Sequence, residues 1–285
     1  MLMVPSLAFA FLSWTAQDRS DVPVEVEPSD PSLAKIVLLA GSFSKGGGEH
    51  EYFAGSALLA QFLRQTPGVA PVLVAEGWPR NERLLENAKS VVFYMDGGGK
   101  QPFLPPERLG LLEKLAARGV GLVHLHQVID YPKAQSERLL PILGGIWVPQ
   151  ASARGHWDGE FKDFVQHPIT RGVTAFREND GFLYKLRFVE DLKGITPLLR
   201  TSPPGGTLKG SEDIVSWAYD RPQGGRTFVF TGGHLQESWG LEPLRRFVTN
   251  GILWSAGLEI PATGAPVSLD PRDLKRHLDP VPPQK

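Results

Sequence analysis

The sequence predicts an α/β fold with three layers, in which a mainly parallel sheet lies between two layers of helices. Two observations support this prediction. In the first half of the chain, short continuous apolar runs alternate with segments of helical periodicity, the pattern of strands buried on both faces and joined by crossover helices. The chain also has 285 residues, 41% of them hydrophobic, which is enough for the core of one large domain.

Four apolar runs in the first half predict the parallel strands. They cover residues 35–40, 71–76, 90–95 and 120–126. Between them we expect helices over 49–66, 81–88 and 105–119, because apolar residues recur there at helical spacing. Gly119 stands where a helix would take its C-terminal cap. Strands and helices in this order imply right-handed crossovers and a doubly wound sheet.

The second half is less regular. Residues 216–230 predict two strands joined by a turn at 221–225, and residues 242–257 predict a closing helix. The stretch between Gly144 and Arg200 is rich in Trp, His, Asp and Phe and predicts no clear order of elements. We therefore place the folded unit at residues 35–259.

The two ends of the chain have a different composition. Residues 1–17 begin with an uncharged apolar run and resemble a signal peptide without its basic start, which predicts a periplasmic or secreted protein with no membrane span after cleavage. A disordered leader or a first strand is the alternative, and a retained leader would leave the protein cytoplasmic. Residues 18–34 have the composition of a linker, and residues 260–285 that of a Pro-rich tail.

Charge and cysteine content exclude several classes of function. Lys and Arg number 30 against 31 Asp and Glu, so the net charge favours neither nucleic acid nor an anionic membrane as partner. A neutral small molecule fits better, and a homo-oligomer is compatible with the sequence. The chain has no cysteine, which excludes disulfides, thiolate metal ligands and a cysteine nucleophile.

Polar side chains follow the predicted strands at one edge of the sheet. Ligand sites of doubly wound sheets lie outside the carboxyl ends of the strands. Four such ends here carry candidate groups: the loop 41–50 with His50, then Asp96 before three glycines, His126 after the fourth strand, and His234 after two glycines. His124 lies one pleat back from His126 and is expected in the core.

Several motifs resemble one family. In chain order, "GEHEYFAGSALLAQFL", "YMDGGG", "RGVGLVHLH", "HPITRGV", "WAYDRPQGGRTFVFTGGH" and "RRFVTNGILWSAG" resemble the ThuA-like, or trehalose-utilisation, family. The resemblance implies a flavodoxin-like fold similar to class I glutamine amidotransferases. His126 matches the position of the amidotransferase nucleophile and His234 that of its late histidine. With no cysteine, glutamine hydrolysis is excluded, and no G-x-S-x-G motif supports a serine hydrolase.

These positions give the candidate catalytic and metal-binding groups. We expect His126, His234, Asp96 and Glu51 to be catalytic, and His50, His126 and His234 to be the candidate ligands of zinc or a similar divalent ion. No zinc sequence motif occurs, and a metal-free imidazole site is equally allowed. The alternatives are a structural histidine at 126, a turn aspartate at 96 and a helix-dipole carboxylate at 51.

Four further residues are expected to bind substrate. Trp157 and Trp239 are candidates for stacking on a sugar ring, with core packing as the alternative for Trp157. Asp180 and Phe43 complete the set. Asp180 matches the first acid of an acidic pair in the family, whereas Gly181 stands where the second acid is expected.

Two hypotheses of function follow. The first is an enzyme of carbohydrate catabolism that acts on trehalose, a related glucoside or a keto-sugar, by histidine and carboxylate acid–base chemistry or with a metal. The second is a non-catalytic carbohydrate-binding domain on a degenerate amidotransferase scaffold. The cluster of histidines favours the first hypothesis, and Gly181 favours the second.

Overall fold

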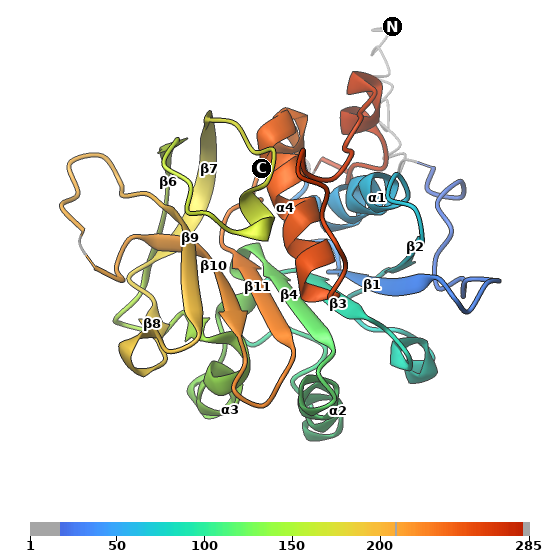
Figure 1. The fold of residues 1–285 in the computed structure, drawn as a ribbon, viewed down its shortest axis with the longest axis horizontal. Helices are drawn as coiled ribbons and strands as arrows, with labels where there is room; N and C mark the ends of the chain where they lie inside the picture. The colour runs from blue at the N-terminus through green and yellow to red at the C-terminus, as the bar shows by residue number, and fades with distance from the viewer. Residues whose placement is uncertain (1–17, 209, 282–285) are drawn as a thin grey trace, which may run out of the picture.

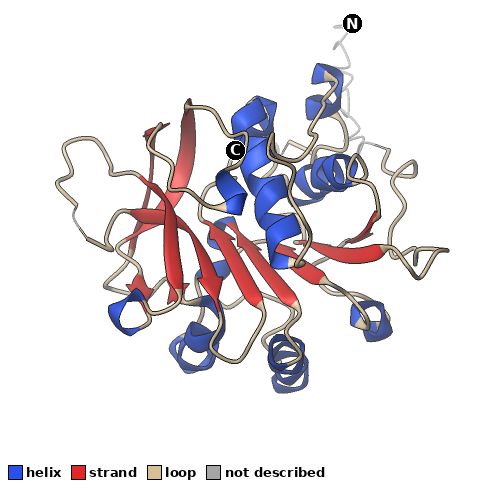
Figure 2. Cartoon of the chain, viewed as in Figure 1, coloured by secondary structure: helices blue, strands red, loops and turns tan. Residues whose placement is uncertain are grey.

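A central sheet of seven strands organises the chain (Figures 1 and 2). The structure, a computed structural model, describes residues 18–208 and 210–281, so the predicted signal peptide lies outside the described residues. The strand order is β2-β1-β3-β4-β11-β10-β9. The strands are β1 (Ala34–Ala40), β2 (Val69–Val74), β3 (Ser90–Tyr94), β4 (Gly121–Leu125), β9 (Ile195–Arg200), β10 (Ile214–Asp220) and β11 (Arg226–Phe230).

The first five strands of that order are mutually parallel, which confirms the predicted α/β fold. Only β10 runs against its neighbours, β11 and β9. Every residue of β1, β3 and β4 is buried, as expected for strands covered on both faces. The carboxyl ends of β1, β3, β4 and β11 therefore meet at one edge.

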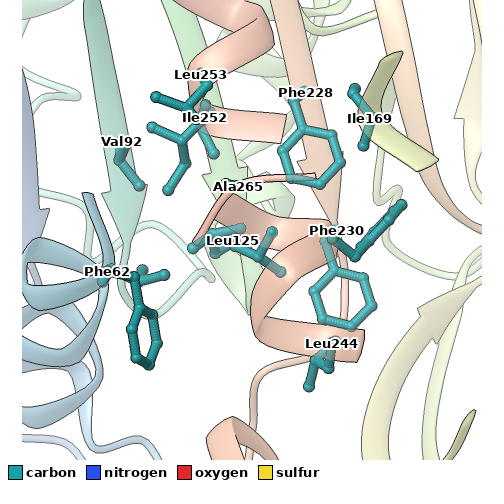
Figure 3. Packing of buried hydrophobic residues seen from close by; sticks show 14 of the residues in the cluster. Phe62, Val92, Leu125, Ile169, Phe228, Phe230, Leu244, Ile252, Leu253 and Ala265 are labelled. Atoms are coloured by element: carbon teal, nitrogen blue, oxygen red, sulfur yellow. The ribbon is translucent and has the colours of Figure 1, made fainter. Parts of the chain in front are cut away.

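Helices cover both faces of the sheet. The helices α1 (Tyr52–Leu63) and α4 (Glu242–Ser255) lie on one face, and α2 (Pro106–Ala117) and α3 (Lys133–Leu143) on the other (Figure 1). Because side chains of a strand alternate between faces, the core divides into two clusters. Figure 3 shows Leu125, Phe228 and Phe230 of the sheet beside Leu244 and Ile252 of α4.

Short elements complete the structure. The predicted helix over 81–88 is a single 3-10 turn, η1 (Glu82–Leu85), which the Asn81 side chain caps. The other such turns are η2 (His126–Ile129), η3 (Pro168–Thr170), η4 (Glu190–Leu192), η5 (Gln236–Gly240) and η6 (Pro271–Lys275). Among the described residues, no helix is long and apolar enough to cross a membrane.

The stretch that the sequence left unassigned forms two small antiparallel pairs. A long hairpin joins β6 (Ala153–Phe161) to β7 (Phe176–Tyr184), and β5 (Gly145–Ile146) pairs with β8 (Arg187–Phe188). Alternate residues of the hairpin point into the α4-side core. The hairpin therefore lies beside the carboxyl edge of the main sheet, where β7 contacts η2 and η5.

The chain beyond Glu259 packs against the domain, although we expected the folded unit to end there. Ile260, Ala265 and Val267 are buried in the α4-side core. The segment then continues to η6, which lies beside α1 (Figure 1). The core therefore extends into the segment predicted to be a tail.

Candidate functional site

Three histidines from three loops converge at the carboxyl edge of the sheet. His50 ends the loop after β1, His126 directly follows β4, and His234 follows β11. His50 Nε2 lies 2.9 Å from His234 Nδ1 and 3.3 Å from His126 Nε2, and the remaining pair of nitrogens is 3.4 Å apart. All three side chains are buried. We call these residues the histidine cluster.

The backbone at this edge is held in an uncommon conformation. His50 has a φ of 55° and His126 a φ of 63°, the left-handed region that non-glycine residues seldom adopt and that costs roughly 1–2 kcal/mol. Gly233, next to His234, has a φ of 88°. Strain of this kind is typical of functional sites, because the surrounding structure must impose it.

A second layer of polar groups orients His50. Asp96 Oδ1 lies 3.0 Å from His50 Nδ1 and accepts a hydrogen bond of 2.7 Å from the hydroxyl of Tyr52. Ser44 donates to the other oxygen of Asp96. Burial alone would raise the pKa of Asp96, but the hydrogen bonds from His50, Ser44 and Tyr52 hold it well below its ordinary value. Asp96 is therefore an ionised carboxylate that directs His50 Nε2 toward the cluster.

His234 is held through its backbone and has a carboxylate near its ring. Its Nε2 lies 3.4 Å from Glu49 Oε2, so a carboxylate faces the ring nitrogen that points away from the cluster. Its carbonyl accepts the N–H of His50 at 3.0 Å, which ties two of the three loops together. Its own N–H donates to Asp180 Oδ1 at 2.9 Å.

Asp180 is a buried anchor for the His234 loop. Its carboxylate also accepts the N–H groups of Gly233 at 2.6 Å and Leu235 at 3.2 Å. Glu178, two residues earlier on β7, is buried as well, and burial together with the neighbouring Asp180 raises its pKa well above the usual range. Glu178 is therefore protonated, and Asp180 is the carboxylate that accepts the backbone N–H groups of the His234 loop. The side chain of Asp180, a predicted substrate-binding residue, has no exposed surface, so the structure places it behind the His234 loop and not in the cavity.

The electrostatics of the cluster suit a cation. Burial and repulsion from the neighbouring imidazoles lower the pKa of His126 well below its ordinary value and that of His234 to about 4. Neutral imidazoles present lone pairs, and a single N–H can bridge only one of the three pairs of nitrogens. Since tetrahedral zinc with bonds of about 2.1 Å places its nitrogen ligands about 3.4 Å apart, the two longer separations fit it directly. The three residues can therefore hold a divalent ion.

A cavity of about 250 Å³ opens beside the cluster. His126 and His234 form one wall, and the β6–β7 hairpin forms another. Arg154, on that hairpin, donates to Gln127 at 3.0 Å and to Asp130 at 2.8 Å. Because its charge is paired with Asp130, the cavity offers hydrogen-bonding groups without a strong preference for an anion. The lining residues are His126, Gln127, Arg154, Gly155, His156, Gly181, Phe182, Leu183 and His234.

Several predicted site residues lie elsewhere. Trp157 and Trp239, predicted to stack on a sugar, are 4% and 1% exposed, and neither lines the cavity. Trp157 points into the core and donates to Thr201 at 2.9 Å. Phe43 is half-exposed on the rim of a separate hollow beside Asp96.

Glu51 has a different role from the one expected. It is buried, and its carboxylate accepts the N–H groups of Gly48 and Asp279. Burial raises its pKa. Glu51 therefore holds backbone in place and does not face the cavity.

Several residues of the site were not predicted from the sequence. They are Ser44, Tyr52 and Glu49, which support the histidines, and Arg154 and Gln127, which line the cavity. Ser44 and Glu49 share the loop of His50. A search of that loop for partners of the imidazole would have found them.

Comparison with known proteins agrees with this architecture. The fold and site define an α/β protein with a mostly parallel sheet and a histidine cluster at its carboxyl edge. A family model described as "ThuA: Trehalose utilisation" matches residues 42–255, most of the chain. The protein therefore belongs to the ThuA family, as the sequence motifs predicted.

Solved structures share the fold at low sequence identity. A ThuA-like protein from Parabacteroides merdae is 15% identical with a TM-score of 0.57, over 86% of this chain and 99% of its own. A second, from Bacteroides uniformis, is 13% identical with a TM-score of 0.51, over 81% of this chain and 94% of its own. A search of curated proteins found no match.

Proposed function

We propose that this protein is a metal-dependent enzyme of carbohydrate catabolism, with zinc or a similar divalent ion held by the histidine cluster. The observation that carries the proposal is the convergence of three imidazole nitrogens within 3.4 Å of one another. Three protein ligands with an open fourth position are typical of catalytic zinc sites. Two of the three ligands, His126 and His234, line the cavity.

The support around the ligands favours a metal over a metal-free pair of imidazoles. Asp96 faces the outer nitrogen of His50, and Glu49 faces that of His234. Carboxylates in this position fix the tautomer and make the inner nitrogen a better ligand. A metal bound there would act as a Lewis acid on a carbonyl or hydroxyl oxygen of the substrate.

We infer that the substrate is a trehalose-related glucoside or its keto form. The family description refers to trehalose utilisation. The cavity supplies an amide, an imidazole and an arginine already paired with Asp130, which suits neutral hydroxyl groups. Gln127, Arg154 and His156 replace the tryptophans as the candidate sugar-binding groups.

The test is metal content followed by turnover. Protein dialysed against zinc should retain about one ion per chain by mass spectrometry, and His50→Ala, His126→Ala and His234→Ala should each lose it. His167→Asn is the matched control, because His167 is not one of the three cluster histidines and caps η3 through Nδ1, which asparagine can also do. Trehalose and 3-ketotrehalose are then incubated with the loaded protein and followed by mass spectrometry.

Two results would count against the proposal. If the wild-type protein retains no zinc, cobalt or manganese, the proposal that the histidine cluster binds a metal is wrong. Metal binding without turnover of either sugar would favour the non-catalytic binding domain.

A further inference from the structure

His156 lies beside the histidine cluster on a different element. It is an exposed residue of β6 and lines the cavity. Its ring packs edge-on against that of His234, with the centroids 4.4 Å apart and an angle of 83° between the planes. His156 is not one of the three residues whose nitrogens converge. It therefore faces the histidine cluster without being a candidate metal ligand.

A glycine allows this approach. Gly181 is the cross-strand partner of His156 in the β6–β7 hairpin. A Cβ atom on residue 181 would lie 2.9 Å from His156 Nε2 and 3.2 Å from the Cβ of His234. Gly181 does not have a positive φ, so the backbone would accept another residue there. The glycine is needed for space, because the imidazole of His156 crosses over it to reach His234.

Among the described residues that line the cavity, the titratable ones are His126, Arg154, His156 and His234. All of them except His156 are engaged in other interactions. Two of them direct a nitrogen into the cluster. Arginine does not give up its proton in proteins, and Arg154 is also paired with Asp130. The imidazole of His156 is the remaining group, and it lies on the cavity wall, where a bound molecule would contact it.

We propose that His156 is a catalytic residue that transfers protons to and from the substrate in the cavity, and that Gly181 is the position that admits it. This inference rests on the proposed function and adds to it the group that handles protons. The metal and His156 would then flank the substrate from two sides.

The proton transfer applies to a carbonyl-containing sugar. The imidazole of His156 takes the proton from the carbon next to the carbonyl, and the C–H electron pair forms a C=C bond while the carbonyl becomes C–O⁻. The imidazolium then returns the proton to a carbon, which completes exchange or isomerisation, or to an oxygen leaving from the β carbon, which completes an elimination. Each route balances without an oxidant or reductant.

The experiment compares four zinc-loaded proteins: wild type, His156→Ala, Gly181→Ala and Gly110→Ala. In Gly181→Ala the new methyl group displaces the ring of His156. Gly110→Ala is the matched control, since Gly110 lies on α2, outside the cavity, and its Cβ would meet nothing within 4 Å. The measured quantities are zinc content and the rate of deuterium uptake from D₂O into 3-ketotrehalose, by NMR, above the rate without protein.

We expect all four proteins to hold zinc equally. Deuterium uptake should fall by about 100-fold or more in His156→Ala and in Gly181→Ala, as for loss of a general acid–base group, and should stay near the wild-type rate in Gly110→Ala. Full zinc content with wild-type uptake in both His156→Ala and Gly181→Ala would overturn the role of His156 alone. If the wild type does not hold zinc, the proposed function is wrong. If zinc-loaded wild type shows no deuterium uptake, both the proposed function and the role of His156 are wrong.

Discussion

Asp96 Oδ1 lies 3.0 Å from Nδ1 of His50, on the side of the ring opposite to the histidine cluster. This contact sets which nitrogen of His50 carries the proton. Asp96→Asn should therefore keep the fold but weaken zinc binding about 10- to 100-fold, the usual effect of losing such a partner. Competition with a zinc chelator measures the affinity. Asp158→Asn, on the exposed face of β6, is the control, and equal affinities in the two variants would contradict the role of Asp96.

Zinc should stabilise the fold through the cluster. A ligand that binds only the native state adds about 2.7 kcal/mol to the free energy of unfolding when its concentration is 100 times its Kd. Urea unfolding of the wild type, with and without zinc, should show this increase. His126→Ala should show none, because it lacks one of the three nitrogens. An equal increase in the free energy of unfolding of the variant would show that zinc binds at another site.

Asp180→Asn should loosen the loop that carries His234. An amide presents a single acceptor oxygen, whereas the carboxylate accepts the N–H groups of Gly233, His234 and Leu235 with its two oxygens. We expect a loss of roughly 1–3 kcal/mol in the free energy of unfolding, the cost of leaving buried donors unpaired. Zinc affinity should fall as well. Unfolding curves and chelator competition measure the two effects.

Glu178→Gln is the companion variant for Asp180→Asn. An amide replaces a carboxyl group that burial keeps protonated, and its N–H₂ can still donate to Asp180. We expect its free energy of unfolding at pH 8 to equal or exceed that of the wild type. If Glu178→Gln is as unstable as Asp180→Asn, the carboxyl group of Glu178 has a role beyond donating a proton.

His124 should make the protein sensitive to acid. Its ring stacks on Phe93 with centroids 4.7 Å apart, and burial lowers its pKa to about 3. The ordinary pKa in the unfolded chain is about 6.5, so below that pH the unfolded chain takes up a proton that the folded one refuses. Stability from this residue is complete above about pH 6.5 and falls by roughly 1.4 kcal/mol per pH unit toward pH 3.

His124→Leu removes that titration. Unfolding free energies of the variant and the wild type, measured from pH 7.5 to 4.5, should separate as the pH falls, with the variant losing less. Parallel curves would show that His124 is accessible to protons in the folded state.

The sequence predicted the parallel half of the fold well because its strands are short apolar runs separated by helices. It failed in the β6–β7 hairpin for a physical reason. The inward positions of β7 include Glu178 and Asp180, so carboxylates interrupt the alternation that marks a strand. Trp157 packs into the core because neighbours on a strand point to opposite sides, and His156 takes the side of the cavity.

The three histidines of the cluster were predictable because each follows a strand that ends at the same edge. Their supporting groups were not. The approach of Ser44 and Tyr52 to Asp96 depends on the path of the loop before α1, which includes three consecutive glycines with positive φ. No periodicity in the sequence encodes such a path.

The family match, residues 42–255, leaves out β1 at one end and the buried Ile260, Ala265 and Val267 at the other. A fragment cut to those limits would keep every histidine of the cluster. It would lose a strand from the interior of the sheet, and the N–H of Ala265 that Asn250 accepts at 2.9 Å would be gone. The stretch that matches the family is therefore shorter than the stretch that must fold together to hold the histidine cluster in place.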